Sequence, residues 1–191
     1  GERMRVEQRL SHQAMHDSLT GLPNWLHLLE RLEEAIEHAR LGIGPIFAVL
    51  FLDPDRFKWV NDSIGHAAGD ELLVEVSRRL SATVYRNDVV CRLGGDEFAL
   101  LIECGDGLES ARELAQRILV TLGKPMWVAG RELFPSASLG IAAWHPRYRS
   151  GEELLRDADA AMYRAKAQGR DRYAVFDEPM REAAMNSLDL E

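Results

Sequence analysis

Two glycines and two acids, Gly94, Gly95, Asp96 and Glu97, lie in a short turn between two apolar runs. Apolar runs on both sides of a tight turn predict a β-hairpin, here with carboxylates at its tip. Glycines leave the backbone bare, so a ligand can approach it closely. Carboxylates suit a divalent cation, and a cation beside bare backbone is a common way to hold a triphosphate. A ligand-free acidic surface hairpin has the same composition, so the motif alone leaves both interpretations open.

A second acidic group, Asp53 and Asp55, follows an apolar run at 46–52 that predicts a buried strand. A carboxylate at the end of a buried strand is costly to desolvate unless it has a partner. We therefore expect Asp53 to share a cation with the hairpin acids. The carbonyl of Pro54 can join it, since proline lacks only a donor. For Asp55 we expect the common role of capping the next helix.

Asn61 and Asp70 flank the junction of two predicted helices. A carboxylate can accept hydrogen bonds from the N1–H and N2–H₂ groups of guanine, and adenine has neither donor. A site built from this pair would therefore select guanine, although both residue types are also common helix caps. His66 lies between them, with no other histidine at metal-ligand spacing, and we expect it to be structural.

Lys166 and Arg170 are four residues apart near the end of a predicted helix, so we expect both on one helical face. Two cations there can neutralise the β- and γ-phosphates of a nucleotide. They can equally satisfy the last carbonyls of the helix, and the spacing does not decide between these roles.

Composition excludes several classes of protein. The chain has 191 residues and a net charge of −8, which disfavours binding to nucleic-acid backbones. No apolar run approaches the roughly 20 residues of a membrane span, and no signal peptide is visible at the start. Cys91 and Cys104 show neither a disulfide framework nor metal-ligand spacing. We expect a cytoplasmic fragment without membrane contact, which leaves open whether the full-length protein is anchored in a membrane.

Hydrophobic periodicity predicts an α+β fold, with a mostly antiparallel sheet flanked by helices. Besides the hairpin, the expected helices cover residues 1–16, 26–40, 57–62, 67–85, 108–122 and 152–168, and the expected strands cover 46–52, 126–128, 134–144 and 173–176. In the helix at 26–40, Leu29, Leu32 and Ile36 form the expected apolar face.

Five segments together resemble the GGDEF domain of diguanylate cyclases, in the order typical of that family. They are residues 17–24, 53–58, 61–70, 92–98 and 161–170. The resemblance covers about 17–177 and implies a palm-like nucleotidyl cyclase fold. It also implies an enzyme that condenses two GTP molecules into cyclic di-GMP and two pyrophosphates, with one GTP held by each domain of a transient homodimer.

The resemblance assigns roles to individual residues. Asp53, Pro54, Asp96 and Glu97 would hold two Mg²⁺ or Mn²⁺ ions per GTP, with Asp96 or Glu97 assisting deprotonation of the attacking hydroxyl. Guanine would be read by Asn61 and Asp70. The implied phosphate-binding positions are Arg56, Phe57, Lys58, Gly94, Gly95, Lys166 and Arg170.

One site of the family is degenerate here. Its inhibitory product site pairs an arginine with an aspartate three residues later; Asp88 is retained, but Tyr85 stands at the arginine position. Tyrosine cannot replace a bidentate arginine contact, so we expect weak or absent product inhibition.

The two ends predict a fragment of a larger regulator. Residues 1–16 are similar to a linker helix from an upstream sensor, and 178–191 to a connector toward a downstream phosphodiesterase (EAL) domain. This arrangement supplies a second hypothesis, in which the domain binds GTP, turns it over slowly and regulates the linked phosphodiesterase.

Overall fold

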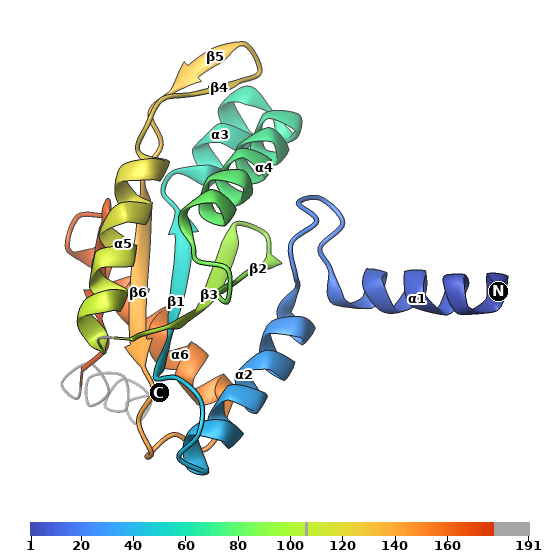
Figure 1. Cartoon of the computed structure of the whole chain (residues 1–191). Coiled ribbons are helices and arrows are strands. Elements are labelled where there is room, and N and C mark those ends of the chain that lie inside the picture. Colours follow the sequence, from blue (N-terminus) through green and yellow to red (C-terminus); the bar gives the residue numbers. More distant parts are fainter. Residues whose placement is uncertain (106, 178–191) are drawn as a thin grey trace, which may run out of the picture.

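The computed structural model describes residues 1–105 and 107–177, which fold into a central sheet with helices on both faces (Figure 1). The helices are α1 (Glu2–Met15), α2 (Trp25–Arg40), α3 (Phe57–Ile64), α4 (His66–Thr83), α5 (Leu108–Leu122) and α6 (Gly151–Ala167). The strands are β1 (Phe47–Pro54), β2 (Val89–Gly94), β3 (Glu97–Glu103), β4 (Met126–Val128), β5 (Arg131–Leu133), β6 (Ala137–Ala143) and β7 (Arg172–Val175).

The main sheet has the strand order β2-β3-β1-β6-β7. Its pairs are antiparallel except for the parallel pair β6–β7, so the predicted mostly antiparallel α+β fold is confirmed. β1 is the central strand, and all eight of its residues are buried. The short strands β4 and β5 form a separate hairpin.

Two hydrophobic clusters cover the two faces of the sheet. One cluster packs α4 and α5 against the even-numbered residues of β1, namely Ala48, Leu50 and Leu52. The other packs α2 and α6 against the odd-numbered residues Phe47, Val49 and Phe51. This strict alternation decides toward which helices the side chains at the end of β1 point.

Two local predictions were wrong in detail. The strand expected at 134–144 begins only at Ala137, and β5 precedes it. In α2, Leu28 is fully buried and Leu29 is only half-buried, because α6 and the sheet determine which side of the helix is covered. Both leucines fit a helical period with Leu32, so periodicity could not separate them.

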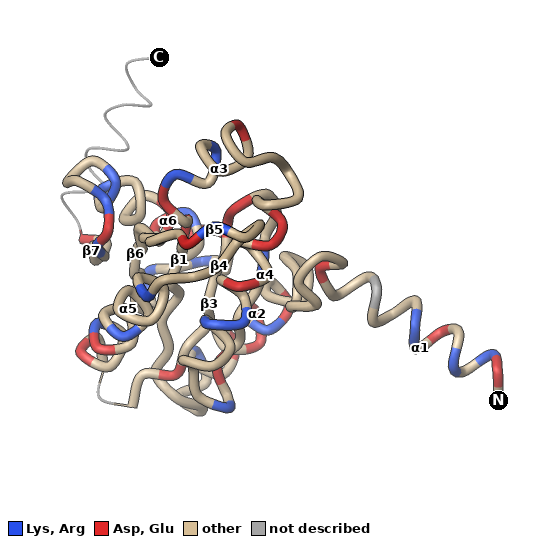
Figure 2. The backbone as a smooth tube through the Cα atoms, turned by 90° about the horizontal axis from the view of Figure 1, so that it is seen from above, with Lys and Arg blue, Asp and Glu red and all other residues tan. Residues whose placement is uncertain are grey.

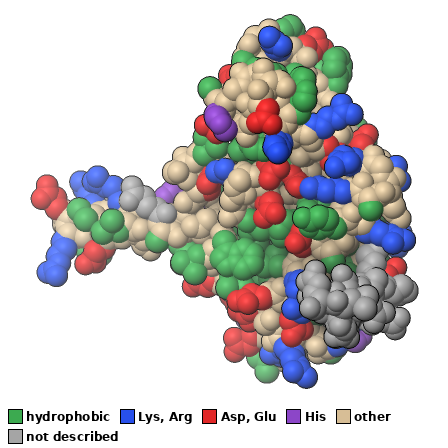
Figure 3. All heavy atoms as spheres, turned by 180° about the vertical axis from the view of Figure 1, so that it is seen from behind, with side chains coloured by type: hydrophobic (Ala, Val, Ile, Leu, Met, Phe, Trp, Pro, Cys, Tyr) green, Lys and Arg blue, Asp and Glu red, His purple; other side chains and the backbone are tan. Residues whose placement is uncertain are grey.

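The predicted first helix, α1, stands clear of the body of the molecule (Figures 1 and 3). Charged residues of both signs are spread along it (Figure 2), and its apolar residues Met4, Val6 and Leu10 are exposed. The boundary between a linker and residues 17–177 stays a prediction, and the connector at 178–191 lies outside the described residues. Within the described part of the chain, no helix is long and apolar enough to cross a membrane.

Candidate active site

Asp53 and Glu97 lie at neighbouring strand ends and face the same helix. The last pair of the β1–β3 ladder joins Leu52 to Phe98, so Asp53 and Glu97 are the next positions along the two strands. Side chains alternate along a strand, so the side chains of Asp53 and Glu97 lie on the face of the sheet that packs against α2 and α6. The tertiary structure thus brings together two acids that are 44 positions apart in the sequence.

Asp53 is part of β1 and only 7% exposed, whereas we expected it just beyond the strand. Its Oδ2 accepts a hydrogen bond from Nζ of Lys166 on α6. Its Oδ1 is buried and, among the described residues, has no hydrogen-bond partner. A buried carboxylate oxygen without a donor is what a bound cation would satisfy, so this chemistry fits the metal ligand that we predicted.

The other acids of the cluster add negative charge at the same place. Burial and the neighbouring Asp96 carboxylate raise the pKa of Asp53, Lys166 lowers it, and the net result is a pKa of about 7. Glu97 is exposed as a residue, yet partial burial of its carboxyl group and the charges of Asp159 and Asp96 raise its pKa. Asp159, on α6, was not among the predicted site residues.

The carboxylates are close without forming a ready-made metal cage. Within residues 1–105 and 107–177, no three His, Cys, Asp or Glu side chains are arranged to hold one ion. Lys166 instead supplies the positive charge beside Asp53. Burial alone would lower the pKa of Lys166, but the hydrogen bond to Asp53 and the charges of Asp53 and Asp96 outweigh burial and raise it.

The raised pKa of Asp53 predicts a pH-dependent stability. Between its ordinary pKa of 3.8 and about 7, the folded protein retains a proton that the unfolded chain has lost, so stability falls as pH rises through this window. We expect the free energy of unfolding of the cation-free protein to decline from about pH 4 to about pH 7, measured against Asp53→Asn by urea titration. A constant difference between the two proteins would contradict this expectation.

The hairpin tip is held by residues whose role we did not predict. Gly94 and Gly95 have φ of 147° and 52°, a region that favours glycine, and the ladder is irregular between Arg92 and Gly94. The guanidinium of Arg92 donates to the Gly95 carbonyl at 2.8 and 3.0 Å and to Asp17 Oδ1 at 2.8 Å. Arg92 therefore ties the turn to the junction that follows α1.

The predicted phosphate-binding backbone lies at the start of α3. Arg56 has φ of 62° and precedes the first helical residue, Phe57, so the first amides of α3 have no partner within the helix. Such amides suit an anion. Asp55 does not cap this helix as expected, because its carboxylate accepts hydrogen bonds from the hydroxyls of Ser136 and Ser138 and from the amide of Asp171.

The predicted guanine-binding pair lies on two consecutive helices, with Asn61 half-buried on α3 and Asp70 exposed on α4. Between them, Gly69 packs directly against the Asn61 side chain, and a Cβ added there would overlap Asn61 Oδ1. Gly69 is thus a further residue, after Asp159 and Arg92, that the sequence analysis did not select. The structural role of His66, the first residue of α4, stays a prediction.

Gly69→Ala is therefore expected to displace the Asn61 side chain and to weaken GTP binding about tenfold, which corresponds to one lost hydrogen bond. Fluorescence titration with a labelled GTP analogue would measure the affinity. In an Asn61→Ala background the second substitution should have no further effect. Independent, additive losses would show that Gly69 does not act through Asn61.

Lys166 and Arg170 do not share a helical face, which corrects the prediction. α6 ends at Ala167, and the amides of Gly169 and Arg170 then bond to the carbonyls of Lys166 and Ala165. This is a Schellman motif, in which a glycine with positive φ turns the chain away from the helix. Arg170 lies in the loop beyond, with φ of 63°.

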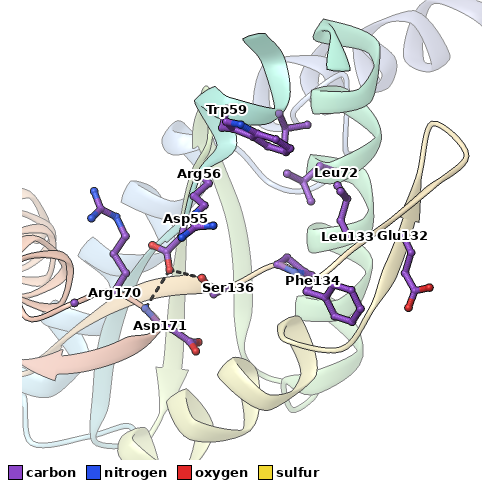
Figure 4. A pocket seen from close by; sticks show the side chains of 13 residues that line it. Asp55, Arg56, Trp59, Leu72, Glu132, Leu133, Phe134, Ser136, Arg170 and Asp171 are labelled. Carbon is purple, nitrogen blue, oxygen red and sulfur yellow. Dashed lines mark hydrogen bonds between the residues drawn. The ribbon is translucent and has the colours of Figure 1, made fainter. Parts of the chain in front are cut away.

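A cavity of about 810 Å³ lies next to this loop (Figure 4). Arg56 and Arg170 line it at one end, and the apolar side chains of Trp59, Leu133 and Phe134 line it at the other. The acids Asp53, Asp96 and Glu97 do not line this cavity, so it is separate from the carboxylate cluster.

At the degenerate position, Tyr85 is 66% exposed and its hydroxyl accepts a 3.0 Å hydrogen bond from Arg117. Asp88 is engaged by the backbone, since its two oxygens accept hydrogen bonds from the amides of Tyr85 and Glu103 at 3.0 and 3.1 Å. The retained aspartate therefore stabilises its own turn.

Comparison with known proteins identifies the family. The model of the diguanylate cyclase GGDEF domain matches residues 14–172. The bifunctional diguanylate cyclase/cyclic di-GMP phosphodiesterase MucR of Pseudomonas aeruginosa is 44% identical over 97% of this chain and 27% of its own length. The cyclic di-GMP phosphodiesterase NbdA of the same organism is 38% identical over 95% of this chain and 23% of its own length.

A solved structure agrees with the fold. The GGDEF domain of TpbB from Pseudomonas aeruginosa superposes with a TM-score of 0.83 at 37% identity, covering 89% of this chain and 99% of that domain. The chain spans only about a quarter of MucR and NbdA, so it corresponds to a part of each. The family match, the shared fold and the acidic hairpin together show that this chain belongs to the GGDEF domain family of diguanylate cyclases.

Proposed function

We propose that this domain is a diguanylate cyclase, which condenses two GTP molecules into cyclic di-GMP and two pyrophosphates. In each step the 3′-oxygen of one nucleotide bonds to the α-phosphorus of the other, and the bond to pyrophosphate breaks. The observation that carries the proposal is the convergence of Asp53 and Glu97 from adjacent strands toward Lys166 on α6. Family membership supports the same reaction.

The residues of the chain bind and orient the nucleotide. Asn61 and Asp70 accept and donate hydrogen bonds at the guanine edge, and the first amides of α3 receive phosphate oxygens. Lys166 and Arg170 balance the charge of the terminal phosphates, for which Lys166 must leave Asp53. This transfer needs positioning and charge neutralisation more than covalent chemistry.

Two divalent cations, Mg²⁺ or Mn²⁺, are proposed to be held by Asp53, Asp96, Glu97 and the Pro54 carbonyl. When bound, they supply positive charge to the entering and leaving oxygens. The carboxylate of Asp96 or Glu97 accepts the proton of the attacking hydroxyl and passes it to solvent.

The product contains two nucleotides while each domain is proposed to bind one, so two copies must meet with their sites facing. At low concentration the second half of the site is absent. Upstream sensor and downstream EAL segments are proposed to control this encounter in a longer protein; the relative MucR is named as both a cyclase and a phosphodiesterase.

Incubation with GTP and Mg²⁺ followed by chromatography tests the proposal. We expect cyclic di-GMP and pyrophosphate in a 1:2 ratio from the wild type and none from Glu97→Gln. The assay is repeated with the domain fused to a dimeric coiled coil, so that weak association does not hide activity. Absence of product from the forced dimer would overturn the proposal.

A second candidate function is favoured by the relative NbdA, which is named a phosphodiesterase although it contains a similar segment. In this alternative the domain binds GTP, turns it over slowly and regulates a linked EAL phosphodiesterase. GTP binding without turnover in the forced dimer would support it.

Product inhibition is expected to be weak because Tyr85 replaces the arginine and Asp88 already bonds to two backbone amides. Micromolar cyclic di-GMP should leave the turnover rate of the wild type unchanged, and Tyr85→Arg should introduce inhibition. If calorimetry shows that the wild type binds cyclic di-GMP at micromolar concentration and that Asp88→Ala does not, the inhibitory product site is functional and this expectation is wrong.

A further inference from the structure

Asp159 lies on the side of α6 that faces the carboxylate cluster. It precedes Lys166 by seven residues, which is close to two helical turns, so both side chains extend from the same side of the helix. Lys166 reaches Asp53, and the charge of Asp159 acts on Glu97. Asp159 therefore faces the position where Asp53 and Glu97 converge.

The Asp159 carboxylate is incompletely satisfied. Its Oδ1 is buried and has no hydrogen-bond partner among the described residues, a property that it shares there only with Oδ1 of Asp53. Asp159 is in the middle of α6, so it does not cap that helix. Two buried, unpaired carboxylate oxygens that face one cluster indicate a missing positive charge or donor.

The Asp53 oxygen is an independent observation of this need, because it belongs to a residue that is more than nine-tenths buried and comes from a different element, β1. Lys166 supplies one positive charge to four acids, which are Asp53, Asp96, Glu97 and Asp159. A divalent cation suits the remaining oxygens, and Mg²⁺ keeps several of its waters when only one or two carboxylates bind it directly.

We propose that Asp159 is a fourth carboxylate of the cation site and holds the cation beside Glu97 through its hydration shell. This inference rests on the proposed function, which places cations on Asp53, Asp96 and Glu97. Asp159 acts as a positioning residue, since it accepts hydrogen bonds from water and touches neither the nucleotide nor the reacting atoms. Such outer partners typically contribute 10- to 100-fold to metal affinity.

The test measures metal binding and not turnover. Mn²⁺ is titrated into the forced dimer in the presence of a non-hydrolysable GTP analogue, and free Mn²⁺ is followed by electron paramagnetic resonance. We expect Asp159→Asn to weaken Mn²⁺ binding about tenfold or more and to leave analogue affinity at saturating Mn²⁺ unchanged. Glu152→Gln, an exposed acid on the same helix, is the matched control and should bind as the wild type does.

The possible outcomes distinguish a failure of this proposal from a failure of the proposed function. If Asp53→Asn weakens Mn²⁺ binding and Asp159→Asn does not, the role of Asp159 is overturned while the proposed function stands. If the wild type binds no Mn²⁺ with the analogue, both are overturned. Asp159→Ser gives the same contrast should the asparagine variant fail to fold, and partial recovery in Asp159→Glu would support a requirement for the carboxylate.

Discussion

Asp53→Asn is expected to reduce GTP turnover by about 10²- to 10³-fold, the scale of losing one preorganised electrostatic group at a reaction centre. The substitution preserves shape but removes the charge that would hold a cation. At the same time, the cation-free protein should become more stable above about pH 7, because a buried carboxylate crowded by Asp96 is no longer ionised there. Lys166 loses its charged partner but keeps 23% of its side chain in solvent, so water can solvate the ammonium group.

Opposite changes in activity and stability distinguish a functional acid from a structural one. Chromatography of cyclic di-GMP measures the activity, and urea unfolding at two pH values measures the stability. Glu103→Gln is the matched control, since Glu103 is an exposed acid at the far end of β3 and should change neither. An Asp53→Asn domain that retains turnover within about tenfold of the wild type would remove the basis for a shared cation site.

Asp70→Asn is expected to lower the preference for GTP over inosine triphosphate, which lacks the guanine amino group, by about 10²-fold. A carboxylate can accept from both N1–H and N2–H₂, whereas an amide presents one oxygen and one donor, so one guanine donor is left unpaired. The two nucleotides differ only at this group, and their competition for the domain isolates its contribution. Glu71→Gln is the control for charge on the same helix, because Glu71 instead accepts a 2.7 Å hydrogen bond from the amide of Ala129.

Selectivity that is unchanged in Asp70→Asn, together with reduced affinity for both nucleotides, would assign Asp70 to the general stability of α4. The predicted Gly69→Ala effect then helps to separate the two halves of the guanine site. The added methyl group of Gly69→Ala would displace only the Asn61 side chain, because Gly69 is the residue of α4 that packs against it.

Much of the architecture was predictable from local pattern. The apolar run at 46–52 became β1, and the predicted helix at 108–122 coincides with α5. The predictions were wrong where two local arrangements fitted the sequence equally well and tertiary packing favoured one of them. Leu28 and Leu29 fit the same helical period, and Asp55 could cap α3 or turn toward the hydroxyls of Ser136 and Ser138. In both cases a distant element decided the outcome.

The sequence by itself determined the chemistry available to this protein: acids and glycines at a hairpin tip, a possible guanine-reading pair, and the family to which they belong. Only the tertiary structure decided that Asp53 and Glu97 face α6 together, that Lys166 reaches Asp53, and that Asp159, Gly69 and Arg92 lie beside predicted site residues. The reason is physical. Residue type and local spacing specify helices, strands and turns, whereas strand register and helix docking depend on burial summed over the whole core, which no short segment contains.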